Sequence, residues 1–392
     1  MIRNAFKIQQ RLLHIAQAQA VYRLSINMVG VFIPFVILEH GGALWMVAGY
    51  YLLRSALKLV INFWFVKLIR HYGAHFGLGF GYVFAALQLA SILGFASTRH
   101  PIFLILGAIS LGLADTFGDN SRHMYISQAM EITARSSSMA TMEIMGQTAD
   151  MIGPLIGAVI GTVFGTTWLL IVALIILGFS VIPLKNMGPM LKFDESTPLY
   201  FGFRGAPARD LFADFCFVAD EAVCLLLWPI YLAVRLGNYI DIGTVTVIAG
   251  LAAIITVWIA GHRGDKGQDK SVLRQGAAGM SIANILRLAA LTPFSIAAVN
   301  VLYQSSQEYT LNALSSTTYS HMKGEGGLQY YSAMQFGTDI AYTCVWAILF
   351  TVLLVSNDAK AFFTTAFILA AVSIWGVMLI TPHRKSDTRR AA

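Results

Sequence analysis

Twelve apolar stretches recur along this chain, each long enough to cross a lipid bilayer as a helix. In an α-helix, about 20 residues span the hydrocarbon core of a typical membrane. Because no water is available there to pair backbone N–H and C=O groups, each crossing segment must satisfy them internally, as an α-helix does. The stretches therefore predict an all-α polytopic membrane protein with 12 transmembrane helices.

The composition agrees with this prediction. Hydrophobic residues make up 57% of the chain and charged residues only 12%, whereas roughly a quarter of the residues in a soluble domain are charged. We expect helices at approximately 13–38, 43–66, 77–97, 102–128, 137–163, 167–184, 211–234, 242–261, 274–295, 296–319, 329–355 and 360–381.

A more polar stretch separates the sixth predicted helix from the seventh. It contains Pro189, Pro198 and Pro207, and proline interrupts a helix because it lacks an N–H. We therefore expect an N-terminal six-helix bundle over residues 1–184, a cytoplasmic linker over 185–210, and a C-terminal six-helix bundle with a short basic tail over 211–392.

The distribution of positive charge predicts the orientation. Of the 27 Lys and Arg, nineteen fall on the side shared by both termini, three on the opposite side and five within helices. Cytoplasmic loops carry the excess of Lys and Arg, so we expect both termini in the cytoplasm of a bacterial cell, with the protein in its inner membrane. This asymmetry accounts for the net charge of +7 without a nucleic-acid partner.

Ionisable residues interrupt the apolar stretch that follows Gly112. Asp115, Asp119 and Arg122 are spaced i, i+4 and i+7, which places them on one face of a helix. A carboxylate near the middle of a membrane costs about 2.5 to 3.5 kcal/mol even on a lenient scale, so such residues indicate a polar path. We expect this face to line a cavity.

The same acidic pattern recurs in the second half of the chain. A shift of 189 residues places Asp150 over Asp339 and Asp119 over Glu308. Many transporters consist of two related helical halves with the substrate site between them near the middle of the membrane. The chain is therefore predicted to contain two pseudo-symmetric halves.

Two motifs resemble those of a known family. Gly146, Gly153, Pro154 and Gly157 resemble the fifth-helix G-P-x-x-G motif of the major facilitator superfamily, which is associated with its exporters, although Ala158 replaces the second glycine of the usual pair. The loop GHRGDKGQDK resembles the family loop G-x-x-x-D-[RK]-x-G through Gly261, Asp265 and Lys266. The glycines of the fifth helix also predict close packing against another helix, a reading that any helical bundle would fit.

The resemblance implies roles for the polar residues within the helices. In this family helices 1, 4, 7 and 10 line the cavity, and helices 2 and 11 meet across the two halves. Arg54 or Lys58 of helix 2 would then pair with Asp339 of helix 11 as a gate. The candidate substrate- or proton-binding residues are Asn27, Asp115, Asp119, Arg122, Asp150, Asp220, Glu221, Gln304 and Glu308; the candidate gating residues are Arg54, Lys58, Asp265 and Asp339.

The predicted helices contain more acidic than basic residues, so not every acid can be paired. An unpaired carboxylate in an apolar site can exchange a proton near neutral pH, which proton-coupled transport requires. We expect a proton-coupled secondary transporter of small organic solutes that works by alternating access as an antiporter, with export favoured. The alternative on the same fold is a lipid or lysolipid flippase, and a membrane-embedded enzyme is the alternative from another class.

We expect no enzymatic activity, no cofactor and no metal. The nine histidines show no metal-ligand spacing, and Cys216, Cys224 and Cys344 are expected to be free, buried thiols. The expected partners are a small-molecule substrate, protons and membrane lipids, with no nucleic acid, and the expected state is a monomer.

Overall fold

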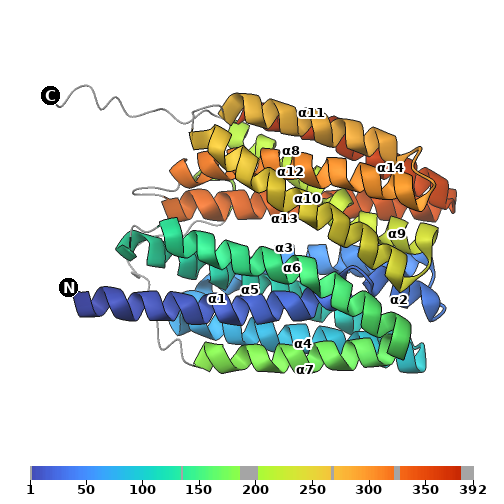
Figure 1. The fold of residues 1–392 in the computed structure, drawn as a ribbon, viewed down its shortest axis with the longest axis horizontal. Helices are drawn as coiled ribbons and strands as arrows, with labels where there is room; N and C mark the ends of the chain where they lie inside the picture. The colour runs from blue at the N-terminus through green and yellow to red at the C-terminus, as the bar shows by residue number, and fades with distance from the viewer. Residues whose placement is uncertain (1, 134–135, 186–201, 266–268, 322–326, 381–392) are drawn as a thin grey trace.

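The computed structural model describes residues 2–133, 136–185, 202–265, 269–321 and 327–380, and all of the regular structure in these ranges is helical. Figure 1 shows the long helices running side by side. They are α1 (Ile2–Gly30), α2 (Ile33–Glu39), α3 (Leu44–Tyr72), α4 (Ala74–Thr98), α5 (Ile102–Thr133), α6 (Ser136–Phe164), α7 (Thr166–Lys185), α8 (Ala208–Ala222), α9 (Trp228–Leu236), α10 (Tyr239–Asp265), α11 (Asp269–Arg287), α12 (Pro293–His321), α13 (Gly327–Ser356) and α14 (Ala359–Ser373).

Every predicted helical range overlaps a helix of the structure. Within the described ranges, ten helical segments are long and apolar enough to cross a membrane. Neither α11 nor α12 is among them, because α11 carries charges near both ends and α12 contains many Asn, Gln, Ser and Thr residues. The total of 12 transmembrane helices therefore stays a prediction.

The helices before and after residues 185–210 pack chiefly on helices of their own half. In the N-terminal half α1 packs on α6 and α7, α5 packs on α3 and α4, and α4 also contacts α7. In the C-terminal half α12 packs on α10 and α11, α8 packs on α13 and α14, and α11 contacts α14. Most of the predicted linker lies outside the described residues, and the division into two six-helix bundles stays a prediction.

Among the described residues, three helix pairs make the main contacts between the two halves. Helix α3 packs on α13, α6 packs on α10, and the short α2 packs on α9. The first of these pairs is the contact expected between the second and eleventh predicted helices. In Figure 1 the N-terminus of α1 lies at one end of the molecule, and α2 and α9 lie at the other, which we call the far end.

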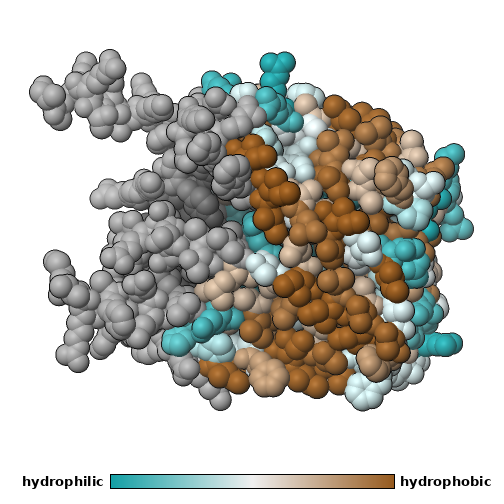
Figure 2. All heavy atoms as spheres, viewed as in Figure 1, coloured by the Kyte–Doolittle hydropathy of each residue, from teal (hydrophilic) through white to brown (hydrophobic). Residues whose placement is uncertain are grey.

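The surface carries an apolar band across the helices. Figure 2 shows hydrophobic residues gathered over the middle of this face and hydrophilic residues at the far end. Large apolar side chains such as Leu155, Phe179 and Ile255 are exposed on this outer surface. Exposed apolar area on this scale is expected where lipid, not water, surrounds the protein.

Two of the predicted helices are interrupted at corresponding prolines. The first predicted helix is divided into α1 and α2, and Pro34 lies in the first turn of α2. The seventh consists of α8, a π-helix over Val223–Leu227, and α9, with Pro229 in the first turn of α9. Proline is tolerated in a first helical turn because its missing N–H would have no helical partner there.

Glycines of α6 allow close contacts with two other helices. A Cβ added to Gly153 would lie 3.1 Å from the Leu24 carbonyl oxygen of α1, and one at Gly157 would meet the backbone of Met28. One turn further, a Cβ at Gly161 would lie 2.7 Å from the ring of Tyr239 in α10. The glycine face therefore packs on α1 and then on α10, as its spacing predicted.

Tyr239 joins the two halves at the far end. Its ring lies against Phe32 and Phe35, with centroids 5.1 and 4.7 Å apart. Its hydroxyl lies 2.5 Å from the Thr166 hydroxyl and donates to Glu39 Oε2 at 3.3 Å. A side chain of α10 is thus held by residues of α2 and α7 and by Phe32, which precedes α2.

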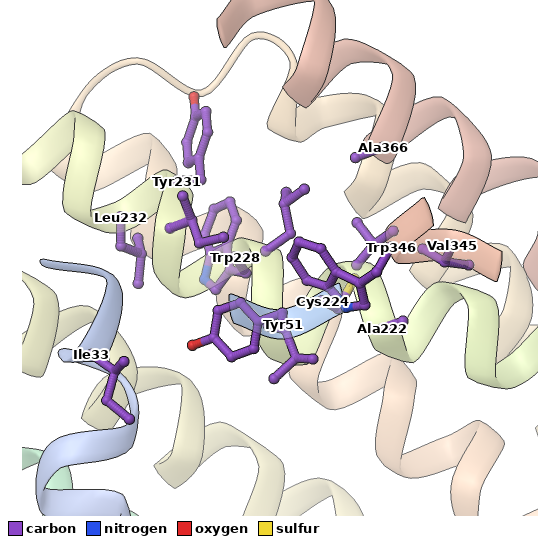
Figure 3. Close-up of a cluster of buried hydrophobic side chains, with 14 of the residues drawn as sticks. Ile33, Tyr51, Ala222, Cys224, Trp228, Tyr231, Leu232, Val345, Trp346 and Ala366 are labelled. Carbon is purple, nitrogen blue, oxygen red and sulfur yellow. The ribbon is translucent and has the colours of Figure 1, made fainter. Parts of the chain in front are cut away.

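The buried core continues across the contact between α3 and α13. Figure 3 shows part of it, where Tyr51 of α3 and Trp346 of α13 lie together near Trp228 and Tyr231 of α9. The Tyr51 and Trp346 ring centroids are 5.2 Å apart, and both side chains are buried. This aromatic contact lies about one turn from the polar residues described next.

Candidate functional site between α3, α5, α8 and α13

Three polar side chains follow one face of α3. Arg54, Lys58 and Asn62 are spaced i, i+4 and i+8, so they lie above one another on the helix. The face that carries them is turned toward α5 and α13, because all three have partners on those helices. A row of charged and amide groups therefore lies along the contact between the two halves.

Arg54 forms an ion pair within the N-terminal half. Its Nε donates to Asp115 Oδ2 of α5 at 2.6 Å, and its Nη2 also contacts this oxygen. The two side chains are only 12% and 13% exposed. The guanidinium carbon also lies 5.6 Å from the ring centroid of Tyr342 in α13, a distance at which a cation is attracted to an aromatic ring.

Lys58 forms an ion pair between the halves. Its Nζ lies 3.5 Å from Asp339 Oδ1 of α13, and the side chains are 12% and 0% exposed. Asn62 Nδ2 donates to the other oxygen of Asp339, and Asn120 Nδ2 of α5 donates to Asn62 Oδ1 at 2.6 Å. Of the two cations predicted to pair with Asp339, Lys58 does so and Arg54 pairs with Asp115. Their action as a gate stays a prediction.

Two acids of α8 meet the same face of α13. Tyr342 Oη donates to Glu221 Oε2 at 3.0 Å, and Thr338 Oγ1 donates to Asp214 Oδ2 at 2.9 Å. We refer to these side chains, Asp339 and the α3 row together as the polar network; Tyr342 contacts the α3 row because the Arg54 guanidinium lies over its ring. Asp214 was not among the predicted site residues, although its spacing of i, i+7 from Glu221 places both on one face of α8.

Asp220 points in a different direction from its neighbour Glu221. Its Oδ1 accepts from Asn284 Nδ2 of α11 and its Oδ2 accepts from the Tyr303 hydroxyl of α12, both at 2.5 Å. Asp220 is completely buried. The divergence follows from the turn of about 100° between successive residues of an α-helix.

The remaining predicted residues of α5 lie beside each other. Arg122 Nη2 is 3.7 Å from Asp119 Oδ1, and their side chains are 24% and 49% exposed. The predicted face of Asp115, Asp119 and Arg122 thus carries one carboxylate paired with α3 and one beside a cation of its own helix.

Asp150 is held within the N-terminal half. Arg23 Nε of α1 donates to Asp150 Oδ1 at 2.8 Å, and Asn27 Nδ2 donates to the same oxygen at 2.6 Å. The structure thus brings the two predicted residues Asn27 and Asp150 together with Arg23.

Two predicted site residues lie on α12. Gln304 and Glu308 are half-buried, and the Asn312 amide donates to the Glu308 backbone carbonyl at 2.8 Å. Asp265 is the last residue of α10, and its side chain lies outside the described part of the structure. The polar row of α12 therefore stays a predicted binding surface.

The structure corrects one prediction about the thiols. Cys216 and Cys224 are buried and free, as expected, but Cys344 is exposed on α13. A search of the described residues finds no group of three His, Cys, Asp or Glu side chains placed to hold a metal ion.

Residues 15–199 match the family model of the Major Facilitator Superfamily. This match supports a membrane transporter of the major facilitator kind over the N-terminal part of the chain, and members of this family are transporters, not enzymes. No curated protein matches the chain.

Several residues of the polar network were not predicted as site residues. They are the uncharged Asn62, Asn120, Thr338 and Tyr342. Amide and hydroxyl groups are common in membrane helices, where they join neighbouring helices. They therefore indicate a functional site less strongly than charged groups do. Asn62 alone gave a usable signal, because it extends the i, i+4 spacing of Arg54 and Lys58.

Proposed function

We propose that this chain is a proton-coupled secondary transporter that exports small organic solutes by alternating access. In such a mechanism the two halves rock about a central site that opens to each side of the membrane in turn. The contacts that join the halves must therefore break and form again. Some of these contacts between the halves must respond to the binding of protons and solute.

The buried Lys58–Asp339 pair carries this proposal. It joins α3 to α13 and is almost removed from solvent. Burying an ion pair is no more stabilising than well-packed apolar side chains, because desolvation offsets the attraction. A charged link at the contact between the halves is therefore better explained by a need to break and reform than by stability.

Glu221 is our candidate for the proton-carrying residue. Its described partner is the Tyr342 hydroxyl, and no ion pair within 4 Å involves it among the residues that the structure describes. Protonating a carboxylate that has no close cation breaks no ion pair, and a buried carboxylate favours its neutral form. Tyr342 lies between Glu221 and Arg54, because Arg54 is over its ring. A proton on Glu221 would therefore change the electrostatic environment of the α3–α13 contact.

The remaining features support a class of solute and a direction. Asp119 and Glu308, on α5 and α12, are partly accessible acids on helices that line the cavity in this family. Acidic groups suit a cationic or zwitterionic organic solute. Export is favoured by the motif that contains Gly153, Pro154 and Gly157.

The test uses purified protein in liposomes that contain a pH-sensitive dye, exposed to a panel of organic cations and zwitterions under an imposed pH gradient. We expect one solute class to drive proton movement. Glu221→Gln should abolish this proton movement while leaving exchange of labelled solute for unlabelled solute. Asp241→Asn is the matched control, because Asp241 is an acid on the surface of α10.

Asp119→Asn and Glu308→Gln extend the test to the predicted solute-binding acids. We expect both to weaken solute exchange itself. Proton movement that is unchanged in the Glu221, Asp119 and Glu308 variants would contradict the coupling proposed here. Movement of a labelled lipid, with no response to any solute, would instead support the flippase alternative.

A further inference from the structure

A buried arginine in the C-terminal half lies outside the network proposed for transport. Arg287 is the last residue of α11, and none of its surface is exposed. Its guanidinium carbon lies 4.2 Å from the ring centroid of Trp228 and 4.1 Å from that of Tyr303. Aromatic faces attract a cation, but they accept no conventional hydrogen bond from its N–H groups.

Only part of this guanidinium is hydrogen-bonded. Arg287 Nη1 donates to Asn284 Oδ1 and to Cys224 Sγ, each at 2.7 Å. Arg287 Nε and Nη2 have no partner among the described residues, and neither does the indole N–H of the adjacent Trp228. Leaving a buried donor unpaired destabilises the folded protein, and more so when the group is charged. Three such donors within one cluster favour binding of an acceptor.

The neighbouring carboxylate does not supply this acceptor. Both oxygens of Asp220 are occupied, one by the Asn284 amide and one by the Tyr303 hydroxyl. The described residues contain no ion pair within 4 Å between Asp220 and Arg287. Asn284 lies between them, because it accepts from Arg287 and donates to Asp220. The positive charge of Arg287 is thus only indirectly balanced.

We propose that Arg287 and Trp228 bind one small monovalent anion, of the size of chloride, inside the C-terminal half. The anion accepts from the Nε and Nη2 edge of the guanidinium and from the Trp228 indole N–H. A small anion fits better than an organic solute, because Arg287, Tyr303 and Trp228 are 0%, 1% and 4% exposed. The site is separate from the Lys58–Asp339 pair and from Glu221, so it does not depend on the function proposed above.

The test measures thermal unfolding of the purified protein in detergent, followed by circular dichroism. Sodium chloride is titrated against sodium gluconate at constant ionic strength, so that only the identity of the anion changes. A ligand at concentration L that binds the native state stabilises it by RT ln(1 + L/Kd), so the midpoint keeps rising with the logarithm of the ligand concentration above Kd. We expect such a rise with chloride and with bromide, and no rise with gluconate.

Three variants assign the effect to this site. Arg287→Gln should remove the dependence on chloride, and Trp228→Phe, which keeps an aromatic face but loses the N–H, should weaken chloride binding about tenfold. Asp220→Asn should strengthen it about threefold or more, because a nearby negative charge is removed. A purely structural role of Asp220 predicts no such gain.

Trp346→Phe is the matched control for Trp228→Phe. The Trp346 indole N–H is also buried without a partner among the described residues, but it lies on α13 against Tyr51. Its loss should leave the response to chloride unchanged. Should Arg287→Gln fail to fold, equal responses of the two tryptophan variants would overturn the proposal. Equal midpoints of the wild-type protein in chloride and gluconate would also overturn it.

Discussion

The cations of two ion pairs lie one turn apart on α3, and their acidic partners lie in different halves of the protein. Arg54 pairs with Asp115 of α5, in the same half of the protein, whereas Lys58 pairs with Asp339 of α13, in the other half. Both pairs are nearly buried, with cation exposures of 12%. The difference therefore lies in connectivity and not in environment.

The chemistry of each cation suits its connection. Arginine has a planar, permanently charged fork, and here two of its nitrogens contact one carboxylate oxygen. Lysine is a compact charge on a flexible stem and makes a single contact at 3.5 Å. We infer that the Arg54 pair stays formed when the halves move, and that the Lys58 pair breaks. The following predictions test this distinction in order of decreasing effect.

The largest effect is expected for Arg54→Met. This change leaves Asp115 buried without its cation, which typically costs about 3 to 5 kcal/mol. A lower midpoint of thermal unfolding would report the loss. The double variant Arg54→Met/Asp115→Leu should recover most of the stability, because no unpaired charge remains. No recovery would mean that Arg54 acts mainly through other contacts, such as the ring of Tyr342.

Lys58→Met should cost less, about 1 to 2 kcal/mol, because Asn62 and Gln335 still donate to Asp339. Its main effect should be on the separation of α3 and α13, measured as the distance between spin labels on the two helices. We expect a larger population with separated helices than in the wild-type protein. The exchange Lys58→Asp/Asp339→Lys should restore the wild-type distribution, and an unaltered distribution in Lys58→Met would refute the gate.

Tyr239→Phe tests the other contact between the halves, at the far end. The variant keeps the ring against Phe32 and Phe35 but loses the hydroxyl that contacts Thr166 and Glu39. A single hydrogen bond contributes about 1 kcal/mol, so the unfolding midpoint should fall slightly. Spin labels on α2 and α9 should show greater separation, and an unchanged separation would mean that the hydroxyl does not hold this contact.

The smallest effect is expected for Asp150→Asn. The Arg23–Asp150 pair lies within one half, and its side chains are 22% and 34% exposed, so solvent screens much of the attraction. A loss of about 1 kcal/mol or less is expected in thermal unfolding, without a change in the α3–α13 distance. A marked change in that distance would mean that pairs within a half also control its movement.

The helices were predictable because their signal is strong and local. Each apolar stretch became a helix, since the cost of burying unpaired backbone groups leaves a membrane segment little choice. The sequence did not locate the break between Gly30 and Ile33 or the π-helix over Val223–Leu227, although Pro34 and Pro229 lie close to them.

The site was predictable in its charges and not in its pairings. Asp115, Asp339, Arg54 and Lys58 stood out because charges are rare in apolar helices. Whether Arg54 meets Asp115 or Asp339 depends on the rotation of α3 about its axis, which is set by packing against both neighbours. The role of the Tyr342 hydroxyl was not predicted, because a tyrosine in a membrane helix can simply pack its ring or form a structural hydrogen bond.

The π-helix in the seventh membrane segment changes the rotation of the residues before it relative to those after it. A π-turn holds more residues than an α-turn, so the residues before Val223 are rotated relative to those after Leu227, compared with an uninterrupted α-helix. Asp220 and Glu221 lie on one side of this wide turn, and Trp228 and Tyr231 on the other. Deleting a single residue within it would produce a continuous α-helix. The acids would then turn by about 100° away from their present partners, while the aromatic residues stayed in place.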